Sequence, residues 1–197
     1  MLSSLAPSNI VLQVDLMLLS ALSSQLLIVD VQERLLPAMS AADTCLTNMV
    51  RLATSARHLG LPITISEQYP QGIGPTVPPI RAACEGAAET LTKITFSCAH
   101  DEKIAARITS LGRRQLVICG IEAHICVLQS ALAFAHAHFE VFVVADAIAS
   151  RESASKEIAL RRLEHAGVTP VTVEMAIFEW LGRAGTADFK TLQQLIK

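Results

Sequence analysis

The sequence predicts a three-layer α/β/α fold built on a mostly parallel six-stranded sheet, in a Rossmann-like doubly wound arrangement. The first observation is that short apolar runs alternate along the chain with segments of helical periodicity. The second is that some of these runs are continuously apolar, which is typical of strands covered on both faces. The third is composition: 197 residues, 51% hydrophobic and 17% charged, can bury one large core, so we expect a single domain.

Six segments are predicted to be strands, because each is a short apolar run bounded by turn-forming residues. The run LLIVDV is apolar on both sides of its aspartate, as expected for a buried strand of a parallel sheet. The predicted strands are residues 26–31, 61–66, 92–96, 115–119, 140–146 and 168–175.

Helical segments follow most of these runs, and several end at a glycine, a residue that readily ends a helix. The predicted helices are residues 43–59, 101–111, 124–138, 152–167 and 187–197. Residues 67–80 contain two glycines and four prolines, so we predict a long ordered loop there and no regular element. Strands that alternate with helices favour right-handed crossovers and helices on both faces of the sheet.

The N-terminal segment and the cysteines indicate the compartment. Residues 1–29 contain no lysine or arginine, which disfavours a secretory signal or a transit peptide. We expect residues 1–22 to be an extension or lead-in and residues 23–197 to be the single domain. Five cysteines without a CxxC pair suggest reduced thiols, so a cytoplasmic protein is expected. The net charge of −2 and the lack of a basic block argue against nucleic acid as a partner. The apolar run around Val11 to Leu22 is too short and too polar to span a bilayer, so no membrane partner is expected.

Three candidate catalytic residues lie at one edge of the predicted sheet. Asp30 lies near the end of the first strand, Lys93 lies in the third, and Cys126 follows the fourth. Ligands of parallel sheets bind beyond the carboxyl ends of the strands, so these residues are expected to meet there. A helix N-terminus and a neighbouring ammonium would both favour the thiolate form of Cys126.

Each of these residues also has an ordinary structural interpretation. A lone cysteine is most often a core residue, a carboxylate at a strand end often caps a turn, and a lysine is usually a surface charge. Together, however, the three supply a base, a cation and a nucleophile. Competing motifs fail: the sequence has no G-x-S-x-G, no arginine directly after Cys126, and no complete dinucleotide fingerprint in GIGPTV.

Three segments in order, LLIVDVQERL, LTKITFS and VICGIEAHICVLQSAL, resemble the isochorismatase-like cysteine hydrolases, which are related to the nicotinamidases. The loop EQYPQGIGPTVPPI is similar to the isochorismatase-domain branch of that family. The resemblance extends from about Ser24 to Lys197 and implies a catalytic triad of Asp30, Lys93 and Cys126. In that mechanism Asp30 takes the thiol proton, Lys93 holds the charge pair, and Cys126 forms a thioester with the substrate.

The same resemblance implies a cis peptide bond between Ile121 and Glu122. It also implies an oxyanion hole formed by the N–H groups of Glu122 and Cys126. Nicotinamidases carry an Asp-x-His metal motif after the second strand, whereas this chain has the sequence SEQY there. We therefore predict no metal and no cofactor, and we doubt nicotinamide as the substrate.

Glu67, Gln68 and Tyr69 are the predicted substrate-binding residues, since they follow the second strand. The family usually self-associates, so we expect a homo-oligomer, a dimer or higher. The leading hypothesis is a metal-independent cysteine hydrolase of a small amide or another C–N bond. The alternative is a catalytically silent isochorismatase-like domain that acts as a binding or assembly module, which an intact triad disfavours.

Overall fold

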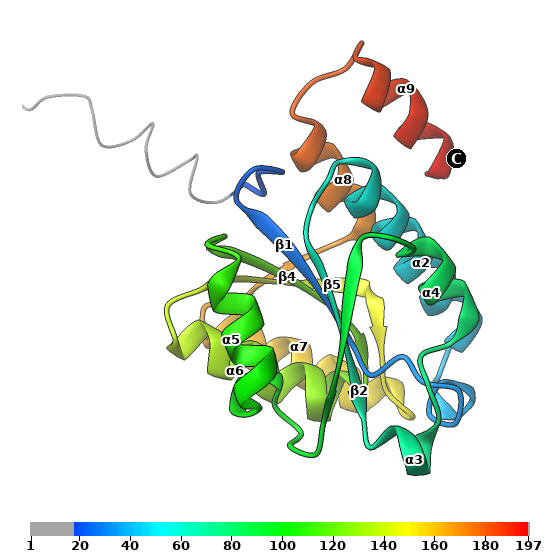
Figure 1. Ribbon diagram of the computed structural model, residues 1–197, viewed down its shortest axis with the longest axis vertical. Coiled ribbons are helices and arrows are strands. Elements are labelled where there is room, and N and C mark those ends of the chain that lie inside the picture. The colour runs from blue at the N-terminus through cyan, green and yellow to red at the C-terminus, as the bar shows by residue number, and fades with distance from the viewer. Residues whose placement is uncertain (1–17, 197) are drawn as a thin grey trace, which may run out of the picture.

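The computed structural model describes residues 18–196, which form a six-stranded sheet with helices on both faces (Figure 1). Every pair of neighbouring strands is parallel. This confirms the predicted three-layer α/β/α class. In spatial order the strands are β3 (Ala88–Lys93), β2 (Ile63–Gln68), β1 (Ser24–Val29), β4 (Gln115–Ile121), β5 (Glu140–Ala149) and β6 (Thr169–Val171).

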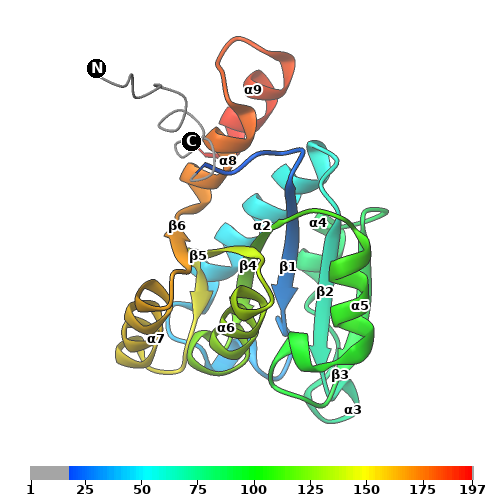
Figure 2. The ribbon, with the colours of Figure 1, turned by 90° about the vertical axis from the view of Figure 1, so that its left-hand side faces the viewer.

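The helices divide between the two faces of the sheet, as Figure 2 shows with one layer in front of the strands and the other behind. The layer behind contains α2 (Ala42–His58), α4 (Pro78–Ala83) and α8 (Val173–Leu181), with α9 (Ala187–Leu192) at its end. The layer in front contains α5 (Glu102–Ser110), α6 (Leu128–His136) and α7 (Ser153–His165). The short helix α3 (Pro70–Ile73) lies at the carboxyl edge of the strands.

Two apolar cores fill the space between the layers because successive side chains of a strand point to opposite faces. In β1, Leu26 and Ile28 pack in the core against α2, whereas Leu27 and Val29 pack in the core beneath α5 and α6. All four are fully buried. This explains why the first strand reads as continuously apolar.

The third strand lies earlier in the chain than predicted: it spans Ala88–Lys93, not residues 92–96. Its last paired residue, Lys93, lies opposite Gln68, where β2 also ends. The apolar residues Ile94 and Phe96 therefore leave the sheet, and their side chains are 72% and 56% exposed. Since β3 is an edge strand, its residues need not be apolar, and apolarity was a misleading signal.

Two other predictions fail for local reasons. Residues 67–80 are not a plain loop, because prolines at the first helical turn start α3 and α4 within them. The last strand is only Thr169–Val171, because the Thr172 side chain accepts from Met175 N–H and caps α8. Helix α8 was missed, although apolar residues at 173, 176, 177 and 180 have helical spacing.

The segment before β1 is only partly described. Residues 1–17 lie outside the described residues, and with them most of the predicted extension. Leu19 is buried, and its N–H donates to Glu179 Oε2 at 2.8 Å, so the end of the lead-in packs on the domain. None of the helices within residues 18–196 has the length and apolarity needed to span a membrane.

Candidate active site

Asp30 and Lys93 form a fully buried ion pair at the carboxyl edge of the sheet. Asp30 directly follows β1 and has a left-handed backbone, with φ of 53°, while Lys93 ends β3. Lys93 Nζ lies 2.7 Å from Asp30 Oδ2, and both side chains are 0% exposed. Ser66, on the strand between them, donates to Asp30 Oδ1 at 2.7 Å. Both oxygens of the carboxylate are therefore held by the protein.

The Lys93 ammonium has an acceptor for each of its three protons. Besides Asp30, it donates to Gln68 Oε1 at 2.7 Å and to the Thr95 carbonyl at 3.2 Å. A buried charge is tolerated only when it is paired and hydrogen-bonded, and Lys93 meets both conditions. The ion pair and the three hydrogen bonds therefore explain how a lysine can lie in the interior.

Cys126 lies on a π-helical turn, Ala123–Val127, which follows β4 and leads into α6. The residue is 7% exposed, and its thiol lies next to the Asp30 carboxylate, close enough for each group to shift the pKa of the other. A second buried thiol, that of Cys98, lies beside Ser66 and Ser130 in the same region. The structure thus brings together Asp30, Lys93 and Cys126, the three residues predicted to form the triad.

The pKa shifts at this site follow from burial and from the ion pair. Burial raises the pKa of Asp30, although Lys93 opposes the change. Burial alone would lower the pKa of Lys93, but the neighbouring Asp30 carboxylate raises it above its ordinary value. Burial and then the charge of Asp30 raise the pKa of the Cys126 thiol, which Lys93 only partly opposes. The resting cysteine is thus a thiol, contrary to the thiolate expected from its place near a helix start.

The turn between β4 and Cys126 is fixed by contacts to the turn after β5. The Ile121–Glu122 peptide bond is cis. Arg151 forms an ion pair with the Glu122 carboxylate: Nη2 donates to Oε2 at 3.1 Å, and Nε lies 2.9 Å from Oε1 without a hydrogen bond to it. Nδ1 of His124 lies 2.8 Å from the Ser150 hydroxyl. The predicted oxyanion hole at the Glu122 and Cys126 N–H groups stays a prediction.

The three predicted substrate-binding residues have different surroundings. Oε1 of Glu67 accepts from the Thr76 N–H, so this side chain holds the proline-rich loop. Glu67 points to the opposite face of β2 from its neighbours Ser66 and Gln68. Gln68 contacts Lys93, and only Tyr69 is well exposed, at 51%. Of the three, Tyr69 alone is free to meet a ligand without breaking an internal hydrogen bond.

Three residues that hold this site were not predicted. Gln32 accepts from Gln68 N–H at 2.8 Å and donates to the Gly74 carbonyl at 2.6 Å, which joins β2 to the loop. Its position two residues after Asp30 was the available signal. Ser66 was visible at a strand end, whereas nothing in the sequence pairs Arg151 with a residue 29 positions earlier.

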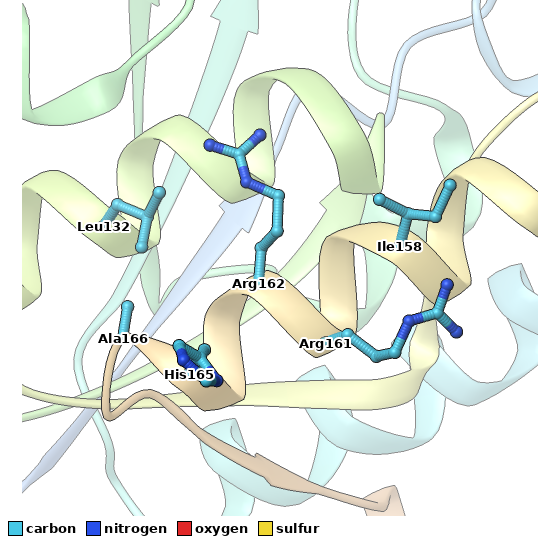
Figure 3. A pocket seen from close by; sticks show the side chains of 6 residues that line it. All are labelled: Leu132, Ile158, Arg161, Arg162, His165 and Ala166. Carbon is cyan, nitrogen blue, oxygen red and sulfur yellow. The ribbon is translucent and has the colours of Figure 1, made fainter.

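A well-formed cavity lies away from this site, between α6 and α7 (Figure 3). Its volume is about 540 Å³, and its lining residues are Leu132, Ile158, Arg161, Arg162, His165 and Ala166. It includes none of the triad residues. Within residues 18–196 there is also no group of three or more His, Cys, Asp and Glu side chains arranged to hold a metal ion.

Comparison with known proteins gives consistent matches over most of the chain. Residues 24–175 match the isochorismatase domain family. Isochorismatase domain-containing protein 1 from Danio rerio is 36% identical over 189 residues, which are 94% of this chain and 66% of that protein. The chain thus spans just under two thirds of that relative.

Two solved structures share the fold. The MAR1 ribonuclease from Caenorhabditis elegans is 30% identical, with a TM-score of 0.85 over 90% of this chain and 91% of that one. The YcaC gene product from Escherichia coli, described as an octameric hydrolase of unknown specificity, is 25% identical. Its TM-score is 0.86 over 91% of this chain and 90% of that one.

Proposed function

This chain belongs to the isochorismatase family and has its hydrolase fold, and we propose that it is a metal-independent cysteine hydrolase. The proposed substrates are small amides or other compounds with a scissile C–N bond, and the proposed triad is Asp30, Lys93 and Cys126. The observation that carries the proposal is the buried set in which Asp30 is ion-paired with the lysine ammonium and lies next to the cysteine thiol. A set of this kind supplies a base, a cation and a nucleophile within one site.

In the proposed first step, Cys126 Sγ attacks the substrate carbonyl carbon while its proton passes to Asp30. The thiol must lose its proton during attack because burial has raised its pKa. The raised pKa of Asp30 suits this transfer, since a base accepts a proton best when its own pKa approaches that of the donor. Lys93 stays protonated and balances the charge.

In the remaining steps the C–N bond breaks and the nitrogen leaves with the proton held by Asp30. This leaves a thioester on Cys126. Asp30 then takes a proton from water, and the resulting hydroxide attacks the thioester. The C–S bond breaks, the carboxylic acid leaves, and the proton on Asp30 passes to Cys126 Sγ to restore the thiol. The N–H groups of Glu122 and Cys126 are the proposed donors to the oxyanion in both steps.

The proposed absence of a metal rests on the donors at the end of β2. Nicotinamidases carry histidine there, whereas this chain has Ser66, Glu67 and Gln68. All three side chains are engaged by protein groups: Asp30, the Thr76 N–H and Lys93, respectively. The amide and hydroxyl oxygens are poor ligands for zinc or iron, and the Glu67 carboxylate is held by the Thr76 N–H, so no histidine-like donor is free there.

The surroundings of the triad favour a small substrate with an apolar part. Cys126 is only 7% exposed, so the reacting carbonyl must enter a narrow opening. Tyr69, Ile94 and Phe96 are large side chains that are at least half exposed, and they follow the strands that carry Gln68 and Lys93. We propose that these three contact the part of the substrate that remains outside.

The proposal is tested with the full-length chain and a panel of small amides, ureides and carbamoyl compounds, by measuring ammonia or amine release. Cys126→Ala and Asp30→Asn should each abolish release, whereas Cys45→Ala, which removes a buried thiol on the other face of the sheet, should retain it. Equal turnover by Cys126→Ala and the unaltered chain would refute the nucleophile.

Two other functions are outcomes of the same panel. If no compound is hydrolysed and Cys126 shows no special reactivity, the silent binding or assembly domain becomes the better account. The C. elegans neighbour is described as a ribonuclease, so RNA is included as a substrate. The net charge of −2 and the closed thiol site lead us to predict no RNA cleavage.

We also propose that the chain forms a homo-oligomer, because the Escherichia coli neighbour is described as an octamer. Exposed apolar side chains at Leu22, Phe178 and Met175 are consistent with buried contacts between copies. Size-exclusion chromatography with light scattering should give particles of at least twice 21.2 kDa. A single species at the monomer mass would contradict this.

A further inference from the structure

Gln68 has its side chain committed to other protein groups at the end of β2. Its Oε1 accepts from Lys93 Nζ at 2.7 Å, and its Nε2 donates to the Ile94 carbonyl at 2.8 Å. Gln32 holds the backbone on both sides: its Oε1 accepts from Gln68 N–H at 2.8 Å, and its Nε2 donates to the Gln68 carbonyl at 3.0 Å. This is the pattern of a residue that supports a neighbour, not of one that awaits a ligand.

The neighbour needs such support because lysine is a long side chain with a freely rotating ammonium. Three acceptors surround Lys93 Nζ: Asp30 Oδ2 and Gln68 Oε1 at 2.7 Å, and the Thr95 carbonyl at 3.2 Å. Gln68 is thus the only neutral side chain in this set, and its distance equals that of the ion pair. Without it, the ammonium would have two acceptors and a proton with none.

We propose that Gln68 is a positioning residue that fixes Lys93 Nζ against Asp30 and so keeps the Asp30 carboxylate oriented toward the Cys126 thiol. This inference rests on the proposed function. It replaces the substrate-binding role that was predicted for Gln68 from its position in the sequence. Gln68 acts through Lys93 and needs no contact with the substrate. Gln32 serves as the fixed support for Gln68.

The groups that set the pH behaviour of this cluster come from several elements. The titratable groups that face Lys93 are Asp30 after β1, Cys98 after β3, and Cys126 after β4. Gln68 on β2 is uncharged, so its removal changes geometry without removing a charge. Replacement by glutamate would place a second carboxylate on the ammonium, and a nearby like charge raises the pKa of Asp30.

The experiment measures the alkylation rate of Cys126 by iodoacetamide from pH 4 to 9 in the full-length protein, by peptide mass spectrometry. In the unaltered chain the rate should rise as Asp30 ionises and then reach a plateau. Gln68→Leu should lower the plateau about tenfold or more, as loss of an outer-shell support commonly does at metal sites. Gln68→Glu retains an acceptor oxygen, so its plateau rate should be higher than that of Gln68→Leu. Its added charge should move the pH at which the alkylation rate rises to a higher value.

Gln25→Leu is the matched control, because Gln25 is also a buried glutamine whose Nε2 donates to backbone carbonyls, those of Ile108 and Arg113. It lies at the other end of the sheet, near the start of β1. Its substitution should destabilise the fold but leave the alkylation profile in place. If Gln68→Leu gives the same profile as Gln25→Leu, Gln68 has no positioning role.

The same data separate this inference from the function beneath it. If Cys126 of the unaltered chain reacts no faster than Cys45, the proposed nucleophile fails irrespective of Gln68. If Cys126 is reactive but neither Gln68 variant changes the plateau rate or the pH at which the rate rises, the proposed nucleophile is supported and the positioning role is refuted. Should Gln68→Leu fail to fold, Gln68→Asn decides the question, because its shorter side chain withdraws the acceptor from Lys93 Nζ without adding a charge: a lowered plateau supports the positioning role and an unchanged plateau refutes it.

Discussion

Replacing Lys93 by methionine should change a balanced ion pair into a single buried charge. Methionine has nearly the length and volume of the lysine stem, so packing is largely conserved. Asp30 would keep its hydrogen bond from Ser66 but lose the ammonium 2.7 Å away, in a place where its side chain is 0% exposed. Removing one partner of a buried pair typically destabilises a protein by about 3–5 kcal/mol.

That loss should depend on pH, because the unpaired Asp30 can take up a proton. Burial already raises the pKa of Asp30, and loss of Lys93 removes the main influence that opposes the shift. In the unfolded chain the carboxyl titrates near ~3.9. A group whose pKa is higher in the folded state stabilises it below the unfolded pKa, and the stabilisation is lost as pH rises. The steepest slope is about 1.4 kcal/mol per pH unit.

The assay is urea denaturation of the unaltered chain, Lys93→Met and the double variant Asp30→Asn/Lys93→Met, followed by circular dichroism between pH 4 and 8. The free energy of unfolding of Lys93→Met should approach that of the unaltered chain at pH 4 and fall about 3–5 kcal/mol below it by pH 8. The double variant should lose most of this pH dependence. A deficit that is constant with pH, or below about 1 kcal/mol throughout, would refute the reasoning.

Three further predictions concern the residues around the triad. Ser66→Ala leaves a buried carboxylate oxygen without its donor, so unfolding free energy should fall by about 1–3 kcal/mol in denaturant titrations, and an unchanged midpoint would contradict this. Arg151→Ala frees the Glu122 turn, so catalytic turnover should fall about tenfold, with Arg151→Lys recovering little because an ammonium cannot place two nitrogens against the carboxylate as the guanidinium does. Glu67→Gln weakens the charged acceptor of the Thr76 N–H, so limited proteolysis should cut the 69–77 loop faster; equal cleavage rates would show that the contact does not hold the loop.

Most of the fold could be predicted from the sequence because buried parallel strands have a strong local signal. The runs that became β1, β4 and β5 are apolar on both faces, and the rule that ligands bind beyond the carboxyl ends of strands then selected one edge. Asp30 and Cys126 were found through this rule. Lys93 was singled out because a lysine interrupts an apolar run, although the predicted strand put it near the beginning and the structure puts it at the end of β3.

The remainder depended on contacts between distant residues, which no local pattern contains. Gln68 was noticed for its place after a strand, but its role depends on Lys93, 25 positions later. Arg151 and Gln32 looked like ordinary polar residues until the fold placed them on Glu122 and Gln68. The thiol pKa was misjudged for the same reason, because burial is a property of the whole fold and outweighs the helix terminus.

The central claim is that Cys126 carries the acyl group of the substrate during turnover. The most direct measurement is peptide mass spectrometry of the full-length protein quenched in acid during turnover of the best amide in the panel. We predict an added mass equal to the acyl group on the peptide that contains Cys126, absent in Cys126→Ser and released by hydroxylamine. Sustained hydrolysis with no acyl mass on Cys126, and undiminished in Cys126→Ala, would contradict it.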